Sequence, residues 1–230
     1  MFMKTQIFAH RGYPVKFPEN SLQGFKYAID HGADGLEFDV HLTKDDVPVI
    51  MHDEKIDRTT KGHGKIHDFT YEQLKKYPLA NGETIPLLKD FLNLVGHHKI
   101  HLNLEFKTNQ IHYKGIEKIV MDMVNDHNLR YPVIYSSFYL QSLKIAQKLD
   151  PSQIYCFLTD KRFKDPKAFI KKEHLSALHP GYYAKGIEDM ERIYTIDNPQ
   201  TMKKLFKRHV RGIFTNDFVT AMKIRDEIQK

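Results

Sequence analysis

The chain has 230 residues and a hydrophobic fraction of 41%, which suits one large globular domain or two small ones. No run approaches the roughly 20 apolar residues that a membrane span needs, and Cys156 alone cannot form an intrachain disulfide. The net charge of +6 is compatible with nucleic acid or an anionic membrane surface, but the most basic stretch, 203–211, is typical of a solvated helix face. We therefore expect no nucleic-acid partner and no stable membrane insertion. The start of the chain is too polar for a secretory signal, so we expect a cytoplasmic protein, either a monomer or a homodimer.

Short strand-like runs alternate with helix-like runs along the whole chain. The predicted strands are Thr5–His10, Gly35–Leu42, Lys99–Lys107, Val133–Phe138, Gln153–Thr159, Leu175–His179, Ile193–Asp197 and Gly212–Thr215. The predicted helices begin with a segment that Asn20 caps and that ends at Gly32, and continue with Pro86–Val95, Tyr113–His127, Tyr139–Leu149, Asp165–Glu173, Pro199–His209 and Phe218–Lys230.

Eight strands that alternate with helices predict a (β/α)₈ TIM barrel, with a doubly wound open sheet as the main alternative. We expect residues 1–230 to form a single domain. Residues 43–85 are too long for a simple strand–helix loop and are interpreted as a small insertion after the second strand. Little room for a helix remains between Tyr182 and Ile193, so the barrel is expected to be abbreviated there.

The first strand ends in His10-Arg11-Gly12, at the end where barrel active sites lie. Arg11 can hold a phosphate with its planar guanidinium, and Gly12 allows a close turn beside a ligand. A second histidine, His52, likewise ends an apolar strand-like run, 47–51. Most of the 14 histidines have no such context, so His10 and His52 are the candidates for catalysis.

Carboxylates gather on one face of two predicted strands. In the second strand Glu37 and Asp39 share a face, because side chains alternate along a strand, and in the third strand Glu105 and Lys107 share one. Three carboxylate oxygen donors favour a hard divalent cation, Mg²⁺ or Ca²⁺. The alternative is that these carboxylates only form ion pairs with Arg11, Lys107 or surface lysines.

Together these groups suit cleavage of a phosphodiester. One histidine would remove a proton from the attacking oxygen while the other protonates the departing alkoxide. The cation and Arg11 would neutralise charge on the phosphoryl oxygens.

Residues 10–64 closely resemble the N-terminal signature of glycerophosphodiester phosphodiesterases, from HRG at 10–12 through PEN at 18–20 and LEFDVHL at 36–42 to MHDE at 51–54. The resemblance continues in LNLEFK at 102–107 and SSF at 136–138. It is weaker in IYTIDN at 193–198 and GIFTND at 212–217, and it spans nearly the whole chain.

The resemblance implies a (β/α)₈ barrel with an insertion after the second strand. It also implies hydrolysis of a small glycerophosphodiester, such as glycerophosphocholine or glycerophosphoethanolamine, to glycerol 3-phosphate and an alcohol. The acid–base pair falls on His10 and His52, the phosphate-contacting cations on Arg11 and Lys107, and the metal ligands on Glu37, Asp39 and Glu105. Glu19 and Asn20 are expected to support the site, although a helix cap is enough to explain Asn20.

The chain departs from the family pattern where a tryptophan usually lines the pocket. Tyr194 stands there, and it is expected to pack against the substrate, or else simply within the core. Two rival functions remain open. A lysophospholipid-directed phosphodiesterase would need an apolar groove, for which residues 63–92 offer candidates that look more like the insertion's own core. A non-catalytic phosphate-binding barrel is disfavoured by the intact histidines and carboxylates.

Overall fold

A parallel barrel forms the centre of the protein. The structure, a computed structural model, describes residues 4–230. Within them eight strands run parallel to their neighbours: β1 (Gln6–His10), β2 (Gly35–Leu42), β4 (His101–Phe106), β5 (Ile134–Ser137), β6 (Ile154–Thr159), β7 (Ala177–Pro180), β8 (Arg192–Ile193) and β9 (Gly212–Thr215).

The strands follow the order β7-β6-β5-β4-β2-β1-β9-β8. A parallel bridge between Leu178 and Glu191 brings the two edges together beside β7 and β8. The sheet is therefore a nearly closed (β/α)₈ barrel, and the predicted fold class is confirmed.

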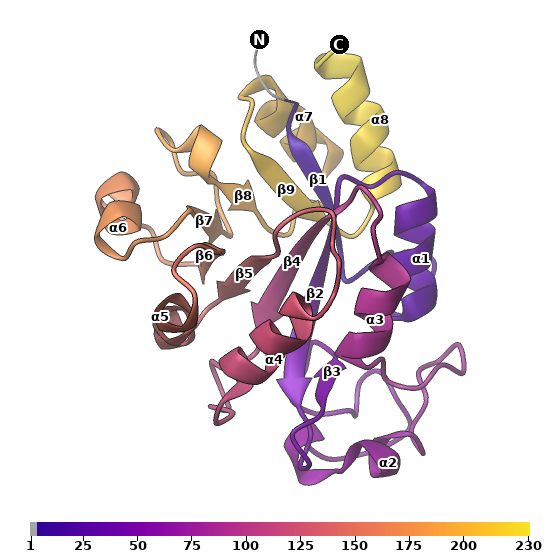
Figure 1. Cartoon of the computed structure of the whole chain (residues 1–230). Coiled ribbons are helices and arrows are strands. Elements are labelled where there is room, and N and C mark those ends of the chain that lie inside the picture. The colour runs from indigo at the N-terminus through magenta and orange to yellow at the C-terminus, as the bar shows by residue number, and fades with distance from the viewer. Residues whose placement is uncertain (1–3) are drawn as a thin grey trace.

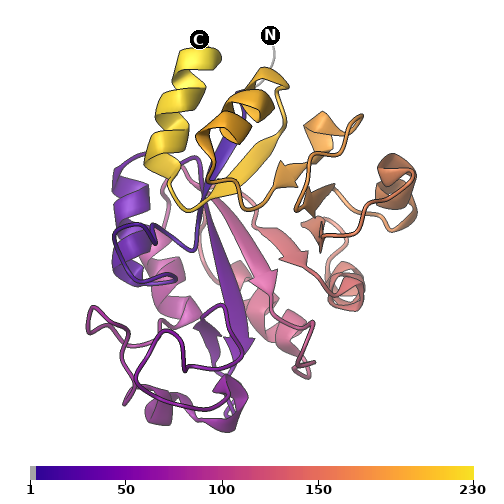
Figure 2. The same cartoon turned by 180° about the vertical axis from the view of Figure 1, so that it is seen from behind.

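Seven helices of the described chain lie around the outside of this sheet in both views of Figures 1 and 2. They are α1 (Leu22–Asp30), α3 (Leu88–Val95), α4 (Ile116–Asn125), α5 (Leu140–Leu149), α6 (Pro166–Lys172), α7 (Pro199–Lys207) and α8 (Phe218–Ile228). Between β7 and β8 there is only the 3₁₀ turn η2 (Glu188–Met190), so the predicted abbreviation of the barrel is confirmed. None of the helices in residues 4–230 is long and apolar enough to cross a membrane.

Two predicted elements extend three or more residues beyond the observed ones at one end. The helix predicted from Tyr113 begins at Ile116, because Gly115 has a left-handed φ of 81° that cannot belong to a helix. The strand predicted over Ile193–Asp197 ends at Ile193. Beyond it the amide of Tyr194 bonds to Pro180 and that of Ile196 to Phe214, so the chain turns from one neighbour to the other.

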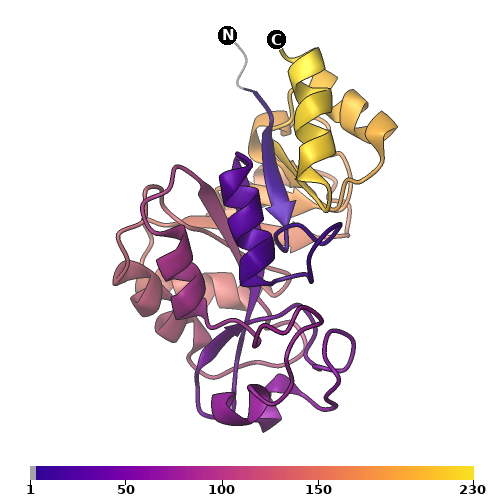
Figure 3. The same ribbon diagram turned by 90° about the vertical axis from the view of Figure 1, so that its right-hand side faces the viewer.

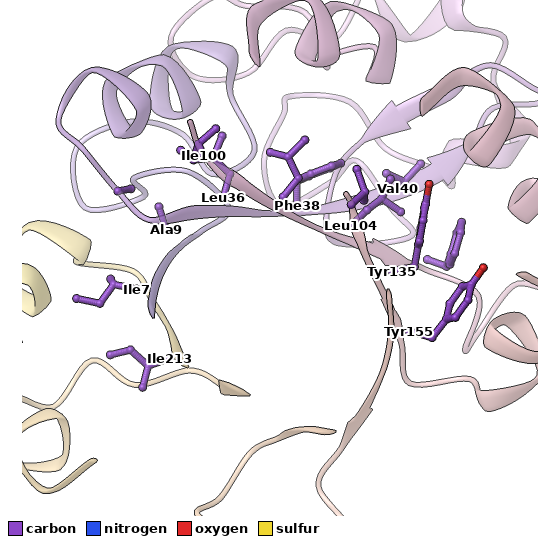
Figure 4. Packing of buried hydrophobic residues seen from close by; sticks show 14 of the residues in the cluster. Ile7, Ala9, Leu36, Phe38, Val40, Ile100, Leu104, Tyr135, Tyr155 and Ile213 are labelled. Atoms are coloured by element: carbon purple, nitrogen blue, oxygen red, sulfur yellow. The ribbon is translucent and has the colours of Figure 1, made fainter. Parts of the chain in front are cut away.

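Most apolar residues of the strands point outward to the helices. Leu36, Phe38 and Val40 of β2 are fully buried, and Figure 4 shows them on the outer side of the curved sheet together with Leu104 of β4. The helices contribute the other side of this core: in the basic stretch at 203–211, Leu205 and Phe206 are buried in it. The outward apolar layer leaves the other face of each strand for the barrel interior.

Inside the barrel, Phe8 lies directly beside Gly35. A Cβ atom at Gly35 would lie 2.4 Å from the ring of Phe8, so only glycine leaves room for the ring. Phe8 packs with Ile134, Cys156 and Phe214 into a small apolar cluster. This cluster fills the barrel below the end at which β1 presents His10.

The segment 43–85 packs around a core of its own. It contains β3 (Pro48–Ile50), η1 (Ile66–Asp68) and α2 (Tyr71–Leu74), and β3 pairs antiparallel with the end of β2. Its fully or largely buried side chains are Val49, Met51, Ile56, Ile66, Tyr71, Leu74, Leu79 and Ile85. Figures 1 and 3 show this segment at the end of the molecule opposite the two termini.

Truncation of a leucine in the main core should be costly. Leu92 of α3 is 0% exposed, so Leu92→Ala should lower the free energy of unfolding by about 2–5 kcal/mol, through lost burial and the cavity left behind. Leu149→Ala is the matched control, because this leucine at the end of α5 is 46% exposed and should change that energy by less than about 1 kcal/mol. Equal losses in urea unfolding of the two variants would contradict the packing described.

Candidate active site

Three buried carboxylates lie together at the C-terminal end of the barrel strands. Glu37 and Asp39 come from β2 and Glu105 from β4, where Asp39 and Glu105 are register partners. One oxygen atom from each can be chosen so that all three lie within 4.8 Å of one another. Since the three side chains are only 1–6% exposed, their negative charges are brought close together away from water.

Two cations compensate part of this charge. The Nζ atom of Lys107 lies 2.9 Å from Oε1 of Glu105 and 3.5 Å from Oδ1 of Asp39. The Nε atom of Arg11 lies 3.6 Å from Oδ2 of Asp39. These are the ion pairs that the alternative interpretation of the sequence required, but two cations face three carboxylates.

The pKa values reflect this imbalance. Burial would raise the pKa of Asp39, but Lys107 and Arg11 outweigh it and hold that pKa below its ordinary value. Burial, together with the charge of Asp39, raises the pKa of Glu37 well above its ordinary value. Burial also raises the pKa of Glu105, although Lys107 opposes the shift. One further positive charge would let all three carboxylates ionise.

The donor atoms fit a hard divalent cation. Apart from their ion pairs with Lys107, Asp39 Oδ1 and Glu105 Oε1 are buried and accept no hydrogen bond within the described residues. The same holds for the amide oxygens of Asn20 and Asn103. Such oxygens suit Mg²⁺ or Ca²⁺, and Glu37, Asp39 and Glu105 are the residues that could hold the ion.

The turn after β1 is shaped by left-handed residues. Arg11 has φ 55°, which costs a non-glycine residue about 1–2 kcal/mol. Its amide donates to Oε2 of Glu37 at 3.0 Å, while its Nη1 donates to Oε1 of Glu19 at 3.2 Å. The strained turn thus ties the backbone to one acidic residue and the side chain to another.

Asn20 belongs to the site and does not cap α1, so the prediction of its role as a cap was wrong. The cap is Ser21, whose hydroxyl accepts from the amide of Gly24 at 3.1 Å. Asn20 has φ 56° and donates from Nδ2 to Oδ2 of Asp39 at 2.9 Å. Asparagine tolerates this left-handed conformation better than most residues, which makes it suited to support Asp39.

His10 is oriented by an amide. Its Nδ1 lies 2.8 Å from Oδ1 of Asn216, and because an amide oxygen only accepts, Nδ1 carries the proton. Nε2 then faces the acidic cluster, 3.8 Å from Oε2 of Glu37. Asn216 is fixed by Asp197, which accepts from its amide nitrogen at 2.7 Å and from its backbone at 2.8 Å.

His52 reaches the site from segment 43–85. It follows β3, which runs antiparallel to β2, so it does not end a parallel barrel strand as His10 does. Its Nδ1 lies 2.7 Å from Oδ1 of Asp53, and its backbone oxygen lies 3.2 Å from Nε2 of the buried His41. The side chain of His52 is about one-third exposed, at 32%.

A cavity of about 210 Å³ brings these groups together. Its lining combines polar and apolar side chains; the lining residues are His10, Arg11, Glu37, His52, Asn103, Glu105, Phe138, Leu158, Tyr194, Thr195 and Phe214. Tyr194 donates its hydroxyl to Oδ1 of Asp160 at 2.8 Å, and its ring meets that of Phe138 edge-on at 5.7 Å. Lys107 is not among the lining residues, since its ammonium is engaged by Glu105 and Asp39.

A larger cavity of about 390 Å³ lies at the other end of the barrel, beside Gln6, Asp34 and His101. This is the end where β1 and β4 begin. Because barrel chemistry takes place at the C-terminal ends of the strands, the smaller cavity with the convergent polar groups is the candidate active site.

Several residues of the site were missed by the sequence analysis. Asn216 immediately follows β9, so the rule that identified His10 at the end of β1 could have found it. Asp53 adjoins His52 but gives no sign in the sequence that it would bind the histidine ring. His41 shares its strand face with Asp39, yet its contact with His52 depends on the path of segment 43–85.

Comparison with known proteins shows, independently of the site geometry, which family this chain resembles. The model of the "Glycerophosphoryl diester phosphodiesterase family" matches residues 10–220. The chain is 34% identical to a glycerophosphodiester phosphodiesterase of Bacillus altitudinis over 98% of this chain and 100% of the relative.

Solved structures show the same fold. A glycerophosphodiester phosphodiesterase of Thermotoga maritima is 28% identical, with a TM-score of 0.78 over 98% of this chain and 100% of that one. A phosphodiesterase of Oleispira antarctica, solved with the product sn-glycerol-3-phosphate, has a TM-score of 0.90 at 24% identity over 97% of each chain.

His10 should remain neutral over an unusually wide pH range. Burial and the neighbouring Arg11 lower its pKa from 6.5 to about 4, since both disfavour the imidazolium. Because the pKa is lower in the folded state, the contribution of His10 to stability is complete above pH 6.5 and is lost as the pH falls towards 4. NMR titration of its ring in excess chelator should place the transition near pH 4, and Arg11→Gln should move it upward. Titration of the native ring near pH 6.5 would refute the described environment.

Proposed function

The chain belongs to the glycerophosphoryl diester phosphodiesterase family and is a glycerophosphodiester phosphodiesterase, and on that premise we propose how its site works. The proposed reaction converts a diester such as glycerophosphocholine or glycerophosphoethanolamine to glycerol 3-phosphate and an alcohol. One observation carries the proposal: His10, His52, Arg11 and the acidic cluster meet around a single cavity.

The mixed lining of the cavity suits a substrate with a charged part and an apolar part. Among the lining residues Arg11 offers a planar guanidinium to the phosphate, while Phe138, Tyr194 and Phe214 offer apolar surface. A volume of about 210 Å³ suits a compact diester better than a lipid with an acyl chain. We assign Lys107 to the same anionic centre, where its charge balances Glu105 and Asp39.

The two histidines are proposed to act as an acid–base pair. Nε2 of His10 carries no proton in the neutral ring and faces the cavity, so it can accept one from an attacking hydroxyl. His52 lines the same cavity, and its Nδ1 is bonded to Asp53. Its Nε2 is therefore the nitrogen that can exchange a proton with the leaving oxygen.

In the first step the glycerol 2-hydroxyl attacks phosphorus, and the bond to the head-group oxygen breaks as one histidine protonates that oxygen. In the second step water opens the cyclic phosphate and the histidines exchange roles.

Glu37, Asp39 and Glu105 would hold a divalent cation, Mg²⁺ or Ca²⁺. When bound, the ion would neutralise negative charge that develops on the phosphoryl oxygens. The residues themselves do the rest: Asn20 and Lys107 fix Asp39, and the amide of Arg11 fixes Glu37.

The two rival functions gain no specific support. Of the apolar residues that could have formed a lipid groove, Leu74 and Leu79 are buried in the core of segment 43–85, against which Phe69 and Tyr77 pack, and Leu88 is buried in the main core. A binding-only barrel would not need two histidines held by separate partners. We further propose that residues 1–230 form one domain with 43–85 as its insertion, acting in the cytoplasm as a monomer or homodimer.

Removal of either histidine should abolish turnover. His10→Ala or His52→Ala should lower kcat for glycerophosphocholine by at least 10²–10⁴-fold, because proton transfer at one of the reacting oxygens is lost. Folding, by circular dichroism, and binding of the cation should change little. His63→Ala is the matched control, since its side chain is 85% exposed and it should keep full activity. Near-native activity in either active-site variant would rule out the assignment.

Chelation should inactivate the enzyme, and an alkaline-earth ion should restore it. The three carboxylates of the acidic cluster are paired with only two cations, so the cluster should bind the ion in the folded state. Because the ion binds the folded state alone, it should also raise the melting temperature. Glycerol 3-phosphate release and melting curves, each recorded with chelator, Mg²⁺ and Ca²⁺ in turn, measure both effects. Full activity in excess chelator would argue against a role for a cation.

A further inference from the structure

The guanidinium of Arg58 lies between two carboxylates. Its Nε donates to Oδ2 of Asp53 at 2.6 Å, and its Nη2 donates to Oδ1 of the same residue at 3.1 Å. Its Nη1 and Nη2 also donate to the two oxygens of Glu19 at 2.8 and 2.7 Å. Both edges of the guanidinium are therefore engaged in two-pronged pairs, an arrangement that only arginine can make.

One of these carboxylates holds a histidine of the proposed acid–base pair. Asp53 uses Oδ1 both for Nδ1 of His52, at 2.7 Å, and for Arg58. The Arg58 guanidinium is the main cause that lowers the pKa of Asp53 to about 2, so Asp53 is a permanent acceptor for the ring. Because Arg58 fixes both oxygens of Asp53, the direction of the His52 ring depends on Arg58.

The other carboxylate connects Arg58 to the barrel. Glu19 lies in the loop after β1 and also accepts from Nη1 of Arg11 at 3.2 Å. A continuous chain of polar contacts therefore runs from Arg11 through Glu19, Arg58 and Asp53 to His52. These contacts connect the barrel to the separately packed segment 43–85.

The fold of segment 43–85 delivers Arg58 to this position. Ile56, two residues before it, is fully buried in the segment's core, and its amide bonds to Gly64. Asp57 accepts from the amide of Gly64 at 2.9 Å. The two residues before Arg58 are thus both bonded to Gly64, which holds the loop that carries Arg58.

We propose that Arg58 is a positioning residue for the phosphodiesterase reaction: by gripping Asp53 and Glu19 at once, it keeps the ring of His52 directed into the cavity. This inference rests on the proposed function of His52. It also gives the insertion a task in catalysis, since the insertion supplies both His52 and the arginine that orients it.

A contribution to stability alone does not account for the arrangement. The side chain of Arg58 is 49% exposed, and ion pairs at such sites stabilise a fold by only about 0–1 kcal/mol. Loss of a residue that orients a catalytic group commonly costs 10–100-fold in activity. Arg58 should therefore matter much more for turnover than for folding.

The test compares Arg58→Met, Arg58→Lys and Arg58→Ala with the native enzyme. Arg58→Met should lower kcat by about 10–100-fold with little change in KM or melting temperature. Arg58→Lys should restore only part of the loss, because one ammonium cannot hold both carboxylates by their edges. Guanidinium ion at a sub-denaturing concentration should partly rescue Arg58→Ala, which a purely structural defect would not show.

A second readout does not depend on turnover. In the native protein the Nδ1 proton of His52 should give a low-field NMR signal because Asp53 shields it from exchange, and Arg58→Met should lose this signal. Arg130→Met, at an exposed arginine, is the matched control for both measurements.

Two outcomes would overturn the inference: kcat of Arg58→Met within twofold of native, or an unchanged His52 signal in that variant. Failure of the proposed function would look different, since the native enzyme would then release no glycerol 3-phosphate while the His52 signal still reported on Arg58.

Discussion

The confinement of three carboxylates inside one barrel is the constraint on which the rest of the site depends. Side-chain alternation on β2 and β4 sends Glu37, Asp39 and Glu105 to the interior, where their mutual repulsion is poorly screened. The neighbouring groups offset this repulsion: Lys107 and Arg11 supply positive charge, and Asn20 and the Arg11 amide donate hydrogen bonds to the carboxylates. The left-handed conformations of Arg11 and Asn20 show where the fold accepts strain to place them.

The two histidines are held by different chemistry. His10 is bonded to a neutral amide and lies beside a guanidinium, whereas His52 is bonded to a carboxylate. Each partner is itself fixed by a further charged residue, Asp197 for Asn216 and Arg58 for Asp53. The orientation of both rings is thus determined two contacts away from the cavity, by residues that need not touch a substrate.

The sequence predicted what depends on local periodicity. The alternation along β2 and β4 identified the acidic cluster, and the position of His10 at the end of β1 follows from the barrel rule. Most of the missed features depend on long-range contacts, although Asp53 adjoins the histidine that it holds. His10 and Asn216 are 206 residues apart, and nothing near either residue indicates their contact. Asn20 was misjudged because asparagine is a common helix cap, and only the structure shows Ser21 in that role.

Segment 43–85 packs around a core separate from that of the barrel, and this division has a consequence for how the enzyme loses activity on heating. Regions with their own small cores open by local unfolding before the whole molecule does. His10 belongs to the barrel, while His52 and Arg58 belong to the smaller unit. Partial melting of that unit would remove one histidine of the proposed acid–base pair from an otherwise intact barrel. On the proposed mechanism we therefore expect activity to be lost at a lower temperature than the barrel fold, because it depends on the smaller of the two cores.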